Sequence, residues 1–242
     1  MPLYGLKCSN LGISAYLEAF KYWQYLKQIM AKNIPLVLRK LAKYHGTTML
    51  GEFSTRYNKW KILISTILSA RARDEVTMPL CDDLFKKYPT MQKLAKAKQR
   101  DIEKLIKRIG FYRNKAKNII QASRMLQEEY KGKVPESKQE LMRLPGVGSK
   151  VAGCVRVYAF NQDSIPVDTH VHKIANRLGW VKTNNPLQTE RELERIVPKK
   201  YWKLVNELFV YHGKTICLSQ VPRCSKCVIA KECKKVGVKK SK

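Results

Sequence analysis

Apolar residues recur three and four positions apart along most of this chain, and that periodicity restricts the fold more than any other feature. The alternating pattern of a half-buried strand, bounded by turn residues, is hard to find. Short connections and cap residues separate the periodic segments. We therefore predict an all-α fold, with helices at about residues 58–70, 74–87, 90–97, 100–109, 115–130, 136–142, 149–160 and 171–178.

Two further helices are expected near the N-terminus. One begins after Ser14 and carries an apolar stripe that includes Phe20. The other begins at Pro35 and ends before Gly46, which suits the left-handed conformation that closes many helices. At the other end of the chain, the basic residues 234–242 have little to bury, and we expect them to be flexible.

The charge balance points to a polyanionic partner. Lys and Arg number 48 and Asp and Glu 19, which gives a formal net charge of +29. Such a surplus repels itself across a folded surface unless a polyanion such as nucleic acid neutralises it. The longest apolar stretch, Ile62 to Ala70, is short and is interrupted by Ser65 and Thr66, so no membrane partner is expected. No secretory signal is recognisable, and we expect a cytoplasmic protein.

Residues 144–148, Leu-Pro-Gly-Val-Gly, form a tight turn between two of the expected helices. Gly146 and Gly148 leave backbone N–H groups uncovered beside the N-terminus of the second helix, where partial positive charge gathers. A phosphate fits this geometry, and such contacts hold a duplex without reading its sequence. An ordinary helix–helix turn with a glycine cap is an equally open interpretation.

Lys150 lies in the first turn of the helix that follows. The helix macrodipole disfavours an ammonium there, and burial would lower the pKa of the amine further, which is what a lysine nucleophile needs. A solvated lysine that contacts phosphate is the alternative. Asp168, in the segment Val167-Asp168-Thr169-His170, is either a helix N-cap or a fixed carboxylate that faces Lys150, and the two roles are compatible.

These segments together resemble the helix-hairpin-helix DNA glycosylases, specifically the endonuclease III family. The resemblance rests on Leu144 to Lys150 and on Val167 to His170, and it extends from about Trp60 to Cys233. It implies a base-excision-repair DNA glycosylase with abasic-site lyase activity. Its substrates would be damaged bases in double-stranded DNA, most simply oxidised pyrimidines. Lys150 would attack the sugar, expel the base and form a Schiff base whose β-elimination cuts the strand, with Asp168 as its carboxylate partner.

The resemblance also implies contacts with DNA. A base must leave the stack before an amine can reach its sugar. Phe111 matches the position of the apolar wedge that fills the gap, although a loop aromatic packed on the core is the alternative. Arg71 stands where the family carries Gln, and it would favour guanine opposite the lesion or bind phosphate. His170 would line the pocket or make a structural hydrogen bond.

Four cysteines lie close together near the end of the chain, with six, two and five residues between them: Cys217, Cys224, Cys227 and Cys233. In a reducing compartment this indicates a metal rather than disulfides. Structural zinc sites usually present two Cys-x-x-Cys pairs, and only one pair here has that spacing. A [4Fe–4S] cluster suits the unequal loops better and is also what the resemblance implies, with zinc as the alternative. Arg223, between the first two cysteines, would then meet phosphate in a fixed geometry.

The resemblance further implies two lobes. Residues 52–162 would form a continuous six-helix domain that contains the hairpin. Residues 1–51 and 163–242 would form an iron–sulfur cluster domain built from both chain ends, with residues 1–30 as an N-terminal extension. These features require only a monomer.

Other functions stay open from the sequence. A mismatch or purine-lesion glycosylase of the same superfamily would share the hairpin, Lys150 and Asp168. A non-catalytic DNA-binding protein would use the hairpin for phosphate contacts alone. An electron carrier built on the cluster accounts poorly for Lys150, Asp168 and the net charge.

Overall fold

Every regular element in the residues that the structure describes is helical, as predicted. This computed structural model describes residues 33–45 and 54–242. Its main elements are helix 33–44, α3 (Lys59–Ser69), α4 (Asp74–Lys87), α5 (Met91–Ala95), α6 (Gln99–Ile106), α7 (Tyr112–Glu128), α8 (Lys138–Arg143), α9 (Ser149–Phe160), α10 (Thr169–Leu178), α11 (Pro186–Ile196) and α12 (Trp202–Thr215). The helix expected after Ser14, the extension at residues 1–30 and Gly46 lie outside the described residues.

Polar side chains begin several helices where the sequence predicts. Asn58 caps α3 and Thr90 caps α5, and each side-chain oxygen accepts a backbone N–H at 3.3 Å. Asn185 caps α11 in the same way at 2.9 Å, with Pro186 as the next residue. Neither α11 nor α12 was among the predicted elements. None of the helices in the described part of the chain is long and apolar enough to span a bilayer.

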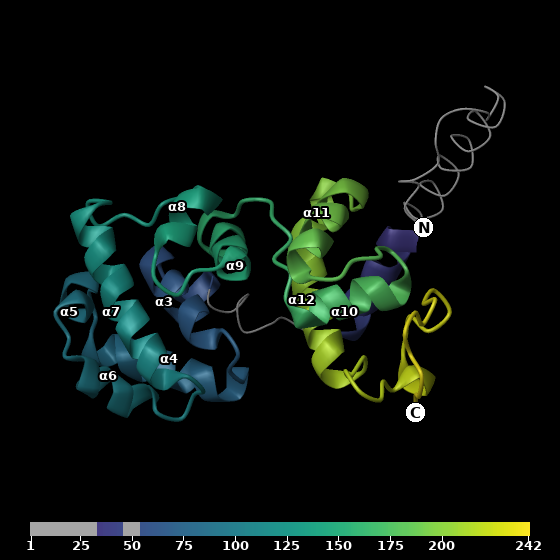
Figure 1. Cartoon of the computed structure of the whole chain (residues 1–242), viewed down its shortest axis with the longest axis horizontal. Helices are drawn as coiled ribbons and strands as arrows, with labels where there is room; N and C mark the ends of the chain where they lie inside the picture. The colour runs from purple at the N-terminus through teal and green to yellow at the C-terminus, as the bar shows by residue number, and fades with distance from the viewer. Residues whose placement is uncertain (1–32, 46–53) are drawn as a thin grey trace, which may run out of the picture.

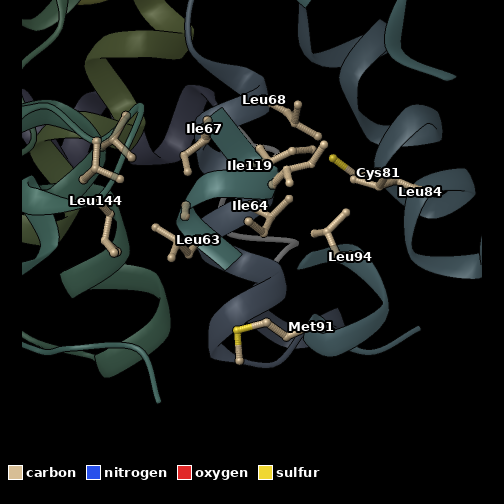
Figure 2. Close-up of a cluster of buried hydrophobic side chains, with 14 of the residues drawn as sticks. Leu63, Ile64, Ile67, Leu68, Cys81, Leu84, Met91, Leu94, Ile119 and Leu144 are labelled. Carbon is tan, nitrogen blue, oxygen red and sulfur yellow. The ribbon is translucent and has the colours of Figure 1, made fainter. Parts of the chain in front are cut away.

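Helices α3 to α9 share one hydrophobic core, and residues 59–160 are called here the first lobe (Figure 1). Helix α3 runs through its centre, and its Leu63, Ile64 and Leu68 are completely buried. Figure 2 shows Ile64 and Leu68 beside Ile119 of α7, and Leu144 of the hairpin on the side of Leu63, all within one cluster. The first lobe has seven helices when the five-residue α5 is counted. Residues 62–68 of α3 are all buried, which explains why this stretch is apolar apart from Ser65 and Thr66.

A separate core joins helix 33–44 to the C-terminal third of the chain. The apolar face of helix 33–44, with Val37 and Leu41 fully buried, packs among α10, α11, α12 and the cysteine segment. Figure 1 shows this purple helix beside α10 and the yellow C-terminal segment. Residues 33–45 and 165–242 are called here the second lobe. The two cores fall on either side of the domain boundaries proposed from the sequence, and those boundaries stay a prediction.

The turn between α8 and α9 requires glycine at one position and leaves backbone uncovered at another. Gly146 has φ +83°, and a Cβ there would lie 3.0 Å from Asn118 and 3.1 Å from Ile67. Gly148 is exposed, and nothing lies within 4 Å of its Cβ position. The hairpin therefore holds one glycine that a larger residue could replace only with strain and, two residues later, another glycine with open space beside it.

The basic C-terminal segment is ordered, contrary to the expectation of flexibility. Lys242 donates its N–H to the Pro222 carbonyl at 2.9 Å and accepts the Ser225 N–H at 3.0 Å. Val236 donates to the Arg177 carbonyl at 3.1 Å. Backbone hydrogen bonds, which the side-chain composition of residues 234–242 does not reveal, fasten this segment to the cysteine loop and to the end of α10.

Candidate active site and cysteine cluster

A cleft of about 970 Å³ lies between the two lobes. Its walls come from the turn after α3, from the hairpin before α9, from the first residues of α10 and α11, and from one side of α12. The sequence-predicted site residues that line it are Arg71, Gly146, Gly148, Lys150, Asp168 and His170. The structure thus gathers residues from five separate parts of the chain around one opening.

Lys150 is the second residue of α9 and is half-buried in this cleft. It interacts with Cys154, one turn further along the helix. Burial raises the pKa of the Cys154 thiol, and the charge of Lys150 together with a hydrogen bond from it opposes that rise. The negative charges of Asp168 and Glu190 also act on this thiol. Both carboxylates therefore share the neighbourhood of Lys150.

Asp168 is the N-cap of α10, as the structural interpretation predicts. Its Oδ1 accepts the backbone N–H groups of His170 at 2.8 Å and Val171 at 2.9 Å. Both cap bonds use the same oxygen, so Oδ2 takes no part in them. The cap fixes the carboxylate at the wall of the cleft, so Asp168 can also serve there as the carboxylate partner of Lys150.

His170 ties α10 to α12. It packs against Gly213 so closely that a Cβ on that glycine would lie 2.5 Å from His170 Nδ1. Burial lowers the pKa of His170, and the negative charge of Asp168 opposes the effect. His170 therefore combines a packing role with a place in the cleft wall.

Arg71 and Phe111 meet at the edge of the cleft. Both have left-handed backbones, with φ of 54° and 57°, and Arg71 Cζ lies 6.0 Å from the centroid of the Phe111 ring. The Phe111 side chain is 62% exposed, which contradicts the alternative that it packs on the core. A strained turn that displays an apolar ring to solvent is typical of a functional surface.

The four predicted metal ligands line one pocket in the second lobe, together with α10 residues, His212 and Val238 of the C-terminal segment. Burial raises the pKa of Cys227 to about 11, and the charges of the other three cysteines add to that rise. Several donors point at these sulfurs: Arg177 Nη1 lies 3.3 Å from Cys217 Sγ, and the Lys235 N–H lies 3.4 Å from Cys233 Sγ. Four thiols with N–H donors in an apolar pocket fit an iron–sulfur cluster. Among the described residues, no group of three or more His, Cys, Asp or Glu side chains is already placed to hold a metal ion.

Arg223 lies in the cysteine loop and not in the cleft. Its N–H donates to the Ile216 carbonyl at 2.9 Å, and its exposed guanidinium approaches the Thr215 carbonyl at 3.4 Å. Arg223 thus lies on the cysteine loop, as predicted, and its contact with phosphate stays a prediction.

Three residues of the cleft were not identified from the sequence. Asn206 of α12 donates to the Pro166 carbonyl at 2.6 Å and so holds the segment that leads to Asp168. Glu190 of α11 and Lys214 of α12 complete the charged lining. The Asn185-Pro186 pair, an N-cap followed by a first-turn proline, is a signal that could have located α11 and hence Glu190.

A family model described as the HhH-GPD superfamily base excision DNA repair protein matches residues 64–199. That range contains the hairpin and both Lys150 and Asp168, so fold and site together define a helix-hairpin-helix protein of base excision repair. Endonuclease III of Thermotoga maritima is 47% identical over 174 residues, which are 72% of this chain and 82% of that protein. Endonuclease III of Synechocystis sp. is 38% identical over 208 residues, which are 86% of this chain and 93% of that protein. The chain belongs to the endonuclease III family.

Solved structures agree with this assignment. A trapped endonuclease III–DNA covalent intermediate, an estranged-adenine complex, has a TM-score of 0.71 and 33% identity and covers 89% of this chain and 95% of its own. A non-covalent endonuclease III–DNA complex has a TM-score of 0.70 at the same identity and coverage. The all-α helix-hairpin-helix fold predicted from the sequence is confirmed by these likenesses.

Proposed function

We propose that this chain, a base excision repair DNA glycosylase, uses Lys150 as its nucleophile and also cleaves abasic sites as a lyase. The observation that carries the proposal is the single cleft that holds Lys150 beside Asp168 and the open hairpin backbone at Gly148. An opening between two lobes suits a nucleotide that has left the base stack. The net charge of +29 supports duplex DNA as the partner.

The proposed reaction begins when the Lys150 amine attacks C1′ of the extruded nucleotide. The bond from C1′ to the base breaks, and the base leaves with the proton that the amine releases. The nitrogen lone pair then opens the sugar ring, O4′ takes up a proton, and a Schiff base forms between Lys150 and C1′. Loss of a C2′ proton expels the 3′ phosphate by β-elimination and cuts the strand. The Asp168 carboxylate stabilises the positive charge that develops on the sugar.

The other cleft residues fit the handling of a distorted duplex. The N–H groups at Gly146 and Gly148 would bind a phosphate next to the N-terminus of α9. The exposed ring of Phe111 would fill the gap left by the extruded base. Arg71, beside that ring, would contact the opposite base or a phosphate through its planar set of donors.

The four cysteines would hold a [4Fe–4S] cluster. Family membership and the shared pocket of Cys217, Cys224, Cys227 and Cys233 support this. The cluster would act as a structural staple that orders the cysteine loop, including Arg223. Cys227→Ser should lower bound iron and visible absorption together, whereas a protein isolated with stoichiometric zinc and no iron would contradict the cluster.

Borohydride trapping tests the proposed nucleophile. Wild-type protein should form a covalent complex with a duplex that contains an abasic site, and Lys150→Ala should abolish that complex. Binding to a duplex with a tetrahydrofuran abasic analogue should survive in the variant, which separates chemistry from binding. Lys93→Ala, an exposed change on α5, is the matched control and should trap normally. Undiminished trapping by Lys150→Ala would exclude Lys150 as the nucleophile, and binding without any trapping by the wild type would favour a non-catalytic protein.

The substrate class we propose is oxidised pyrimidines in double-stranded DNA. Arg71 is the one feature that favours the alternative of a mismatch or purine-lesion glycosylase, because its donors match the major-groove edge of guanine. Single-turnover excision from duplexes bearing thymine glycol, uracil or 8-oxoguanine decides between them. We also propose a monomer in a reducing, cytoplasmic compartment, where thiols stay available for the cluster.

A further inference from the structure

Glu190 is a buried carboxylate that joins the two lobes beside Lys150. It belongs to α11 in the second lobe, and only 6% of its side chain is exposed. Its Oε2 accepts the Ser149 hydroxyl at 2.8 Å, and its Oε1 pairs with the Lys138 ammonium. Ser149 and Lys138 belong to α9 and α8 of the first lobe. The carboxylate therefore holds the first turn of α9, the turn that carries Lys150, from the opposite side of the cleft.

This arrangement differs from the other ion pairs. Lys40–Glu232 lies within the second lobe and Arg143–Glu129 lies within the first. The two pairs of Asp163 join the connecting segment to the second lobe. Among the described residues, Lys138–Glu190 is the ion pair whose partners come from helices of different lobes. A buried carboxylate is costly unless it is paired and hydrogen-bonded, and Glu190 meets both conditions.

We propose that Lys138, Glu190 and Ser149 form an inter-lobe clasp that positions Lys150 and balances the charge around its amine. The proposal rests on the proposed role of Lys150 as the nucleophile. Glu190 acts through its neighbours and is a positioning residue. Because the carboxylate is neutralised by Lys138, it can hold the first turn of α9 without stabilising the ammonium form of the amine beside it.

Several other charged or titratable residues lie in or near the same cleft, and variants of the clasp leave their side chains in place. Those in the cleft are Arg71 from the turn after α3, Asp168 and His170 at the start of α10, and Lys214 on α12. Lys173 of α10 lies behind His170. Glu194 of α11 also lies near the clasp: burial and then the charge of Glu190 raise its pKa, and the charges of Lys138 and of Arg156 on α9 oppose that rise. Variants of the clasp leave these residues in place, although they also change the charge that acts on Glu194.

Removing either charged partner of the clasp leaves the other charge unbalanced, and the two removals should shift the pH–rate profile in opposite directions. Glu190→Gln keeps an acceptor for Ser149 and leaves the Lys138 cation unbalanced, which disfavours the ammonium form of Lys150. The pH–rate profile of borohydride trapping should then move to lower pH, by about 0.5 to 1 pH unit for a charge several ångströms away. Lys138→Met leaves the Glu190 anion unbalanced and should move the profile to higher pH. The double variant removes both charges and should return close to the wild-type profile.

The experiment measures single-turnover trapping on an abasic-site duplex from pH 5.5 to pH 9.5, with duplex binding and melting temperature measured for each variant. Glu192→Gln removes a carboxylate from the exposed face of the same helix and should leave the profile unchanged.

Opposite shifts that cancel in the double variant would support the clasp. Slower trapping with an unshifted profile in Glu190→Gln would overturn its electrostatic role and leave only packing. If Lys138→Met does not fold, the shift of the pH–rate profile in Glu190→Gln alone decides whether the clasp has an electrostatic role. Trapping that survives Lys150→Ala would instead refute the proposed nucleophile, so the two failures are distinguishable.

Discussion

Replacing Lys115 with methionine should remove a pH dependence from the stability of the first lobe. The side chain is buried between α7 and the end of α3, where Nζ donates to the Leu68 carbonyl at 2.9 Å. Burial lowers the pKa of Lys115 from 10.5 to about 8. Below pH 8 the folded protein holds the charged ammonium in a buried position, which lowers the free energy of unfolding by the full amount. Between pH 8 and 10.5 the folded protein binds fewer protons than the unfolded chain, so the free energy of unfolding rises with pH. The total change is about 3 kcal/mol, because one pKa unit corresponds to about 1.4 kcal/mol.

Urea unfolding at constant ionic strength measures this effect. The free energy of unfolding of wild type, relative to Lys115→Met, should increase by about 3 kcal/mol between pH 7 and pH 10.5, while groups common to both proteins cancel. Lys117→Met is the matched control, because Lys117 is exposed on the same helix, and its difference from wild type should not vary over this range. A wild-type to Lys115→Met difference that is constant with pH would refute the reasoning.

Three substitutions around the cleft separate stability from function. Gly146→Ala should lower the free energy of unfolding by about 1–3 kcal/mol in urea titrations, because φ is +83° and the new methyl would press on Asn118 and Ile67. Phe111→Ala should leave the melting temperature unchanged, because the ring is exposed. It should slow single-turnover base excision at least tenfold. An excision rate equal to that of the wild type would show that the ring does not hold the gap open. Asp168→Asn should keep the cap on α10, visible as an unchanged melting temperature, and reduce trapping about 100-fold or more, whereas full trapping would leave the carboxylate with the cap alone.

Local signals in the sequence predicted most helices because each has a physical counterpart in the structure. Asn58, Thr90 and Asp168 cap helices since their side chains reach the first free N–H groups, an interaction within a few residues of chain. Helix α11 was missed because its buried side consists of Thr189, Glu190 and Leu193, which give no continuous apolar stripe. The tertiary partners that bury those polar groups lie on α8, α9 and α10, and no window of local sequence contains them.

In the candidate site, too, local sequence reveals some residues, whereas others depend on tertiary contacts. Motifs located Lys150, Asp168 and the hairpin glycines, and the structure places all of them around one cleft. Glu190 could not be assigned a role from the sequence, because a charged residue on a charged helix is usually solvated. Its burial depends on how the two lobes meet. Arg223 lies on the cysteine loop, where the sequence places it, and its contact with phosphate stays a prediction.

The packing of helix 33–44 constrains the order in which the two lobes can fold during synthesis. Its apolar face, including Leu38, is covered by residues that begin at Ile165 and continue past Phe209. During synthesis helix 33–44 leaves the ribosome before the first lobe, and the first lobe leaves it before the residues that cover this apolar face. The core of the second lobe can therefore form only after α10, α12 and the cysteine segment have been synthesised, whereas the first lobe is contiguous and can fold before them.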